Sequence, residues 1–94
     1  MPEVFRLLPS TRFKRDFEVV YKRNPAIARQ IDPVKIILSH DPYNRSRLYD
    51  IKKLKDVRQG DGQYRIRSGK YRVRYDIIGD DVVLYSFKHR REVY

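Results

Sequence analysis

The sequence predicts an α+β domain with element order β-α-α-β-β-β, in which two helices pack on one face of an antiparallel sheet. Two segments of the first half carry apolar residues at helical spacing. The last third holds three β-rich runs separated by tight-turn dipeptides. A chain of 94 residues has room for one core, so residues 1–94 are expected to form a single domain.

The first strand and the first helix are separated by Pro9. Residues 4–8 are short and rich in apolar side chains, which is typical of a strand. Ser10 or Thr11 is a suitable N-cap for a helix over about residues 11–23, which Asn24-Pro25 would close. Its apolar positions are Phe13, Phe17, Val20 and Tyr21.

The second helix is predicted over residues 26–40. Pro33 lies inside it and removes a backbone donor, so we expect either a kink or two short helices. Residues 43–63 read as a long connection, held to the core by Leu48, Ile51 and Leu54. The apolar stripe of the second helix consists of Ile27, Ile31, Val34, Ile37 and Leu38.

Three strands are predicted at residues 63–67, 71–77 and 82–88, joined by turns at Ser68-Gly69 and Gly79-Asp80. Two-residue turns at these dipeptides fix which residues face each other. The first turn pairs Arg65 with Arg72, Arg67 with Lys70, and Ile66 with Tyr71. The second pairs Ile77 with Val82, Tyr75 with Leu84, Arg74 with Tyr85, Arg72 with Phe87, and Lys70 with His89.

Alternation along these strands gathers cations on the sheet face turned away from the core. Like charges opposite each other on a sheet are unfavourable, so folding alone does not explain the pattern, whereas phosphate binding does. A solvated sheet face, with two aromatics packed under the C-terminal tail, is the alternative. The predicted face carries Arg65, Arg67, Lys70, Arg72 and Arg74, with Tyr85 and Phe87 among them and His89 at the edge.

Composition favours a polyanionic partner. Twenty-two Lys and Arg against twelve Asp and Glu give a net charge of +10, which attracts nucleic acid above all. The chain has no cysteine and its two histidines are far apart, so neither a metal site nor another cofactor is expected. His40 is read as a helix-end residue. No long apolar run opens the sequence, so we expect a cytoplasmic protein without a membrane segment.

The run from Tyr64 to Tyr75, YRIRSGKYRVRY, resembles the core signature of the RelE/ParE toxin superfamily. The segment DIKKLK at residues 50–55 and the tail HRREVY at residues 89–94 are similar to those of the RelE branch. This resemblance implies a RelE-like fold and a metal-independent endoribonuclease that cuts messenger RNA in the ribosomal A site. The RNA 2′-hydroxyl would attack the adjacent phosphate and leave a 2′,3′-cyclic phosphate.

The resemblance also implies roles for individual residues. Arg72 matches the arginine beside the scissile phosphate, and Arg65 and Arg67 stand where well-studied RelE toxins have lysines, one of them thought to be the general base. A guanidinium stays protonated, so His89 becomes the candidate acid or base. Arg90 would stabilise charge or donate a proton, and Tyr94 would orient the attacking nucleotide. The expected RNA-binding residues are Lys52, Lys53, Lys55, Lys70, Arg74, Tyr85 and Phe87.

The resemblance leaves two other functions open. A ParE-like toxin would poison DNA gyrase without cutting RNA, and a catalytically weak member would only bind RNA. The expected partners are messenger RNA, the ribosome and an acidic RelB-like antitoxin, with a toxin–antitoxin heterotetramer as one assembly. That antitoxin would wrap the helices and cover or displace part of the Arg65–Arg72 face.

Overall fold

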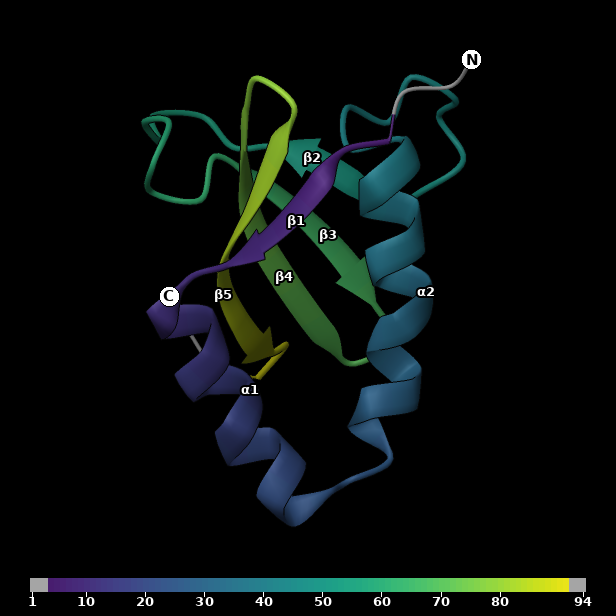
Figure 1. Ribbon diagram of the computed structural model, residues 1–94, viewed down its shortest axis with the longest axis vertical. Helices are drawn as coiled ribbons and strands as arrows, with labels where there is room; N and C mark the ends of the chain where they lie inside the picture. Colours follow the sequence, from purple (N-terminus) through teal and green to yellow (C-terminus); the bar gives the residue numbers. More distant parts are fainter. Residues whose placement is uncertain (1–3, 92–94) are drawn as a thin grey trace.

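A computed structural model describes residues 4–91 as a five-stranded sheet with two helices (Figure 1). The strand order is β1-β5-β4-β3-β2, and β1 runs parallel to β5 while the other pairs are antiparallel. The α+β class is confirmed, but the sheet is mixed, and a short strand forms inside the predicted connection. The elements are β1 (Arg6–Pro9), α1 (Thr11–Arg23), α2 (Ile27–His40), β2 (Ile51–Lys53), β3 (Tyr64–Ser68), β4 (Tyr71–Ile78) and β5 (Asp81–His89).

Both helices form where the apolar spacing predicts them. Ser10 is the N-cap of α1, and its hydroxyl accepts the Phe13 amide at 3.0 Å. In Figure 1, α2 is one continuous ribbon, so the alternative of two short helices is wrong. Pro33 is exposed, while Ile31 and Val34 on either side of it are buried, so packing of the apolar stripe holds the helix together.

The two helices cover the same face of the sheet, as predicted. Side chains of β3, β4 and β5 point toward α1 and α2 and form one core with them. The opposite face of these strands has no described helix on it and is therefore the surface available to a partner. The buried core residues are Phe13, Ile27, Ile31, Val34, Leu38, Ile66, Val73, Tyr75, Ile77, Val82, Leu84 and Phe87.

The connection between α2 and β3 is only partly attached to this core. Ile51 and Leu54 are half-buried, as expected, but Leu48 is 76% exposed and the prediction for it is wrong. Its neighbour Tyr49 is held by the Asn44 side chain, which donates to the Tyr49 carbonyl at 2.8 Å and accepts from its amide at 3.2 Å. This local turn fixes the loop through polar contacts and leaves Leu48 on the surface.

The hairpin between β3 and β4 turns one residue later than predicted. Gly69 and Lys70 form the two-residue loop, and Gly69 has a positive φ of 58°. The opposed pairs are therefore Arg65 with Arg74 and Arg67 with Arg72, not Arg65 with Arg72 or Arg67 with Lys70. Each residue moves by two places against its partner strand, so every side chain that remains in the two strands keeps its predicted face, while Lys70 moves into the turn.

The hairpin between β4 and β5 begins as predicted, with Tyr75 opposite Leu84. A β-bulge then adds Tyr85 to β5, so Arg74 lies opposite Ser86 and Arg72 opposite Lys88. The extra residue reverses the alternation of every later residue of the strand. The predicted pairs Arg74–Tyr85, Arg72–Phe87 and Lys70–His89 are therefore wrong, and Phe87 and His89 lie opposite Val73 and Tyr71 instead.

Past the bulge, α1 covers the open edge of β5. Strand β1 pairs only with residues 81–84. Beyond them, the Ser10 hydroxyl donates to the Tyr85 carbonyl at 3.0 Å, and the Asp16 carboxylate accepts the Phe87 amide at 3.1 Å. Asp16 also pairs with the Lys88 ammonium at 3.4 Å. Helix side chains thus satisfy an edge that would otherwise pair with another strand.

Tyr75 joins the core to the loop after α2. Its side chain is fully buried and its hydroxyl donates to the Pro42 carbonyl at 2.7 Å. Burial, together with the neighbouring Tyr64 and Asp41, raises the pKa of the Tyr75 phenol far above its usual range. The folded protein therefore keeps the phenol proton under alkaline conditions that remove it from the unfolded chain.

We predict that Tyr75→Phe lowers the free energy of unfolding at neutral pH by about 1–2 kcal/mol, because the Pro42 carbonyl loses its donor. The contribution of a raised phenol pKa is complete below about pH 10 and is lost as the pH rises further. The wild type should therefore lose more stability than the variant above pH ~10, and the gap between them should narrow.

Urea unfolding at neutral and alkaline pH measures this gap. Tyr21→Phe is the matched control, because Tyr21 is 45% exposed, and its gap from the wild type should not change with pH. A Tyr75→Phe gap that stays constant or widens at alkaline pH would contradict the prediction.

Candidate nucleic-acid interface

The sheet face turned away from the helices carries two rows of cations across its strands. In the first row, Lys52 lies beside Arg65, which lies beside Arg74. In the second row, Arg67 lies beside Arg72, which lies beside Lys88. The prediction that β3 and β4 gather arginines on one face is confirmed. We call these six residues the arginine face.

The cations of the arginine face repel one another, and the nearby carboxylate of Asp50 offsets part of this repulsion. Asp50 accepts a hydrogen bond from Arg67 Nε at 2.8 Å and contacts Arg65 Nη2 at 3.5 Å. Asp50 and Arg67 are both about half-exposed, so the pair is screened by solvent and contributes little to stability. The excess of positive charge on the face remains available to an anion.

A cavity of about 230 Å³ opens beside Arg72. Arg67, Gly69 and Arg90 line it together with Asp50 and Arg72. The Arg90 amide donates to the Lys70 carbonyl at 2.7 Å, which holds the end of β5 against the β3–β4 turn. Within residues 4–91, the buried Nε of Arg72 has no hydrogen-bond acceptor. Buried donors are normally satisfied, which makes this nitrogen unusual. The three guanidinium groups that line the cavity can bind an anion through charge-assisted hydrogen bonds.

Tyr85 lies on the arginine face as predicted, but its ring is packed rather than open. The Arg12 guanidinium is 4.9 Å from the ring centroid and donates to the phenol oxygen at 3.0 Å. The Arg74 guanidinium is 5.4 Å from the same centroid. Arg74 also donates to the carbonyls of Gly62 at 3.0 Å and Asp61 at 2.7 Å. Tyr85 and Arg74 therefore both connect the sheet to the loop before β3.

A buried carboxylate on β4 also fixes this loop. Asp76 is 1% exposed and accepts the amides of Gly62 and Gln63, each at 3.0 Å. The Gln59 side chain donates to the Ile77 carbonyl at 2.6 Å. The loop thus has a defined position over the first row of the arginine face.

Four of the predicted residues lie away from this face. Phe87 is 1% exposed and stacks on Tyr71 in the core, so no base can reach its ring. His89 contacts Tyr71 edge-on at 5.3 Å on the helix side of the sheet, and the expectation that it borders the arginines is wrong. Lys53 lies over the ring of Tyr64, and Lys70 is in the turn.

The imidazole of His89 faces α1. It lines a cavity with Tyr71, and the remaining walls come from the end of that helix. Its Nδ1 accepts the Arg91 amide at 3.1 Å. The bulge in β5 is the physical reason for this placement, because it turns residue 89 to the opposite side of the strand. Tyr94 lies outside the described residues.

Sequence reasoning missed three residues that shape this surface. Asp50 was read only as the start of a family segment, and its partners depend on the pairing of β2 with β3. Arg12 reaches Tyr85 from α1. Lys88 faces outward only because of the bulge. None of these contacts follows from the spacing of residues along the chain.

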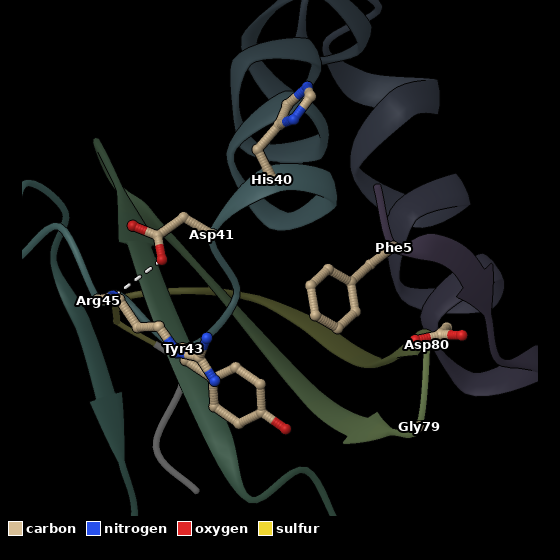
Figure 2. A pocket seen from close by; sticks show the side chains of 7 residues that line it. All are labelled: Phe5, His40, Asp41, Tyr43, Arg45, Gly79 and Asp80. Atoms are coloured by element: carbon tan, nitrogen blue, oxygen red, sulfur yellow. Dashed lines mark hydrogen bonds between the residues drawn. The ribbon is translucent and has the colours of Figure 1, made fainter. Parts of the chain in front are cut away.

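A larger cavity, of about 440 Å³, lies at another place, where α2 ends (Figure 2). Asp41 in its wall accepts the amides of Arg45 and Ser46 at 2.8 and 3.2 Å, so its carboxylate is already used within the loop. His40 is the last residue of α2, as predicted, and Figure 2 shows its imidazole directed away from Asp41 and Tyr43. The polar groups here do not converge on one point.

Residues 4–91 contain no group of three or more His, Cys, Asp or Glu side chains that could hold a metal ion. None of the helices seen in this range has the length and apolar character needed to cross a membrane.

Comparison with known proteins identifies the fold. No protein-family model matches the chain, and neither does any curated protein. It is similar to a chain of the RelE–RelB complex of Pyrococcus horikoshii, at 24% identity over 96% of this chain and 99% of that one, with a TM-score of 0.69. It is also similar to a chain of the RelBE2 toxin–antitoxin complex of Mycobacterium tuberculosis, at 22% identity over 98% of both chains, with a TM-score of 0.60.

A third similar structure is a chain of the RelB–RelE antitoxin–toxin complex of Methanococcus jannaschii. It shares 26% identity over 89% of this chain and 91% of that one, with a TM-score of 0.51. The chain therefore has the RelE-like fold, and the resemblance of its sequence to RelE toxins is confirmed at the level of the fold.

The packing of Tyr85 on the loop predicts different costs for two glycine substitutions. Gly62 and Gly69 both have positive φ, 75° and 58°. A Cβ at residue 62 would lie 2.7 Å from Tyr85 Cδ2, whereas a Cβ at residue 69 meets nothing within 4 Å. We expect Gly69→Ala to lower the free energy of unfolding by about 1 kcal/mol, and Gly62→Ala by about 2 kcal/mol or more.

Urea unfolding of both variants checks this, and a Tyr85→Ala background isolates the cause. Removing the ring should bring the two costs closer together, because the closest contact of the new Cβ is gone. Equal costs in the wild-type background would mean that the ring does not pack against this loop.

Proposed function

We propose that this chain is the toxin of a toxin–antitoxin pair, a metal-independent endoribonuclease that cleaves messenger RNA in the ribosomal A site. The observation that carries the proposal is the cavity lined by three arginines, Arg67, Arg72 and Arg90, one of which, Arg72, has a buried Nε without an acceptor in the described chain. The RelE-like fold, shared with chains of RelE–RelB complexes, supports it.

The reaction proposed for the cavity is a transesterification within RNA, in which the phosphoryl group passes from the 5′-oxygen to the 2′-oxygen. The 2′-oxygen forms a bond to phosphorus and loses its proton, and the bond from phosphorus to the 5′-oxygen breaks as that oxygen takes a proton from solvent water. Negative charge builds on the phosphate oxygens during this step. Arg67, Arg72 and Arg90, which line the cavity, would stabilise that charge through charge-assisted hydrogen bonds.

Proton transfer needs a group other than these arginines, because guanidinium groups stay protonated. His89 is on the other side of the sheet and does not reach the cavity in this arrangement. Asp50 lines the cavity and is held there by Arg67 Nε at 2.8 Å. We therefore assign the proposed proton acceptor to Asp50.

Primer extension on messenger RNA in a ribosome-containing translation reaction tests this function. We predict cuts within codons in the A site for the wild type, reduced about 100-fold or more in Arg72→Ala, because a donor to the transition state is lost. Arg29→Ala is the matched control, since Arg29 is exposed on α2, and it should cut like the wild type.

Two outcomes would contradict the proposal. Undiminished cutting by a folded Arg72→Ala variant would remove this cavity from the reaction. Intact messenger RNA with folded wild-type protein would reject the ribonuclease, and a gyrase supercoiling assay would then test the ParE-like alternative.

We further propose an acidic antitoxin as the partner. An apolar cavity of about 300 Å³ lies between α1, α2 and β1, with Lys14 from one helix and Lys35 from the other in its wall. An amphipathic segment with apolar and acidic side chains fits such a surface. The apolar walls are formed by Leu7, Pro9, Phe13, Phe17 and Leu84.

We predict that Lys14→Glu combined with Lys35→Glu weakens binding of the acidic protein encoded beside this chain by about tenfold or more, because two attractive contacts become repulsive. Isothermal titration calorimetry measures the affinity, and RNA cleavage should be unchanged. Lys22→Glu, exposed at the end of α1, is the control. The proposal fails if no acidic protein encoded there binds, or if the double variant binds as tightly as the control.

A further inference from the structure

A second cavity, of about 310 Å³, adjoins the arginine face and shares Arg72 with the first. Arg65 and Arg74 form its sheet side, and the loop before β3 supplies Leu54, Lys55 and Val57. Leu54 and Val57 are half-buried apolar residues within a strongly cationic surface. The apolar side chains of Leu54 and Val57 would make no favourable contact with a phosphate alone. The cavity therefore fits a ligand that has a flat, apolar part.

We propose that this second cavity binds a nucleobase, that of the nucleotide whose phosphate occupies the Arg72 cavity; the inference rests on the proposed function. The faces of a base stack on arginine planes and pack against aliphatic side chains. Arg65 and Arg74 line the cavity on the sheet side, and Leu54 and Val57 supply the apolar contact. The volume is at the lower end of the range for small-molecule sites.

The shared arginine is what distinguishes a nucleotide from other ligands. A nucleotide carries an anionic phosphate and an aromatic base at a fixed separation, and Arg72 borders both cavities. An apolar side chain alone would fill the second cavity but bring no anion to the first, and the apolar and acidic side chains of a protein segment are not joined at one fixed separation. The combination of charge and apolar surface therefore favours RNA as the occupant.

The wall formed by the loop is fixed before any ligand binds. The Leu54 amide donates to the Gln63 carbonyl at 2.8 Å, and the Gln63 side chain donates to the Val57 carbonyl at 3.2 Å. Arg74 and Asp76 hold the other end of the loop through Gly62. A preformed pocket loses little conformational entropy when the ligand binds. Little of the favourable free energy of the contacts with the base is therefore lost to ordering the loop.

Holding the base also positions the reacting atoms. Only the glycosidic torsion and the pucker of the ribose separate the base from the 2′-oxygen. A fixed base therefore restricts the position of the 2′-oxygen relative to the phosphate at Arg72. Restricting that approach accelerates an intramolecular attack. The second cavity would thus contribute both to the choice of nucleotide and to the rate of cleavage.

The test uses binding of short single-stranded RNA with a 2′-O-methyl group at the scissile position, so that no cleavage occurs. A series of such oligonucleotides, each lacking one base, is compared with the intact one by fluorescence anisotropy. We expect one abasic position to weaken binding to the wild type about tenfold. In Val57→Trp, whose indole fills the cavity, the intact RNA should bind about tenfold more weakly, and the same abasic position should cause no additional loss.

Leu48→Trp is the matched control, because Leu48 is 76% exposed and outside the cavity, and it should behave like the wild type. The abasic series on the wild type needs no variant, so it decides the question even if Val57→Trp does not fold. A wild type that cleaves messenger RNA but shows no position-dependent abasic effect overturns the nucleobase pocket alone. A wild type that neither binds nor cleaves RNA overturns the proposed function and this inference with it.

Discussion

The bulge at Tyr85 is the constraint on which the rest of the structure depends, because it decides the side of the sheet for each later residue of β5. Phe87 turns into the core as a result and stacks on Tyr71, while Lys88 joins the second row of the arginine face. Strand β1 ends at Pro9, opposite Leu84, so beyond that point α1 covers the edge of β5 through Ser10 and Asp16. One added residue thus links the core, the helix and the charged surface.

The arginine face is stable only because other interactions offset its repulsion. Direct opposition of Arg65 with Arg74 and of Arg67 with Arg72 costs up to about 1 kcal/mol for each pair. Burial of the residues behind these strands, such as Ile66 and Val73, provides several times that amount of favourable free energy. The fold can therefore hold these cations close together before an anion binds, and binding the anion then relieves the repulsion.

Much of this could be predicted from the sequence, because alternation and turn dipeptides are local signals. The two hairpins, both helices and the outward direction of Arg72 follow from such signals, and the one-residue error in the first turn left every residue of β3 and β4 on its predicted face. The bulge could not be predicted, since the pattern Leu84-Tyr85-Ser86-Phe87 reads equally well as regular alternation. His89 was misplaced for that reason alone. Contacts such as Arg12 with Tyr85 depend on tertiary packing, and no spacing rule reports them.

In the proposed function, Arg65 and Arg67 stand where the resemblance to RelE toxins places lysines, and this difference separates two tasks of the proposed site. Arginine grips phosphate oxygens well but does not exchange protons near neutral pH, so a site built from it separates charge stabilisation from proton transfer. In this chain the carboxylate that remains near the phosphate cavity is anchored by one of those same arginines, at 2.8 Å. An anion entering the cavity would compete with Asp50 for Arg67 and weaken that ion pair. Substrate binding would then replace one partner of Arg67, the Asp50 carboxylate, with another, a phosphate oxygen.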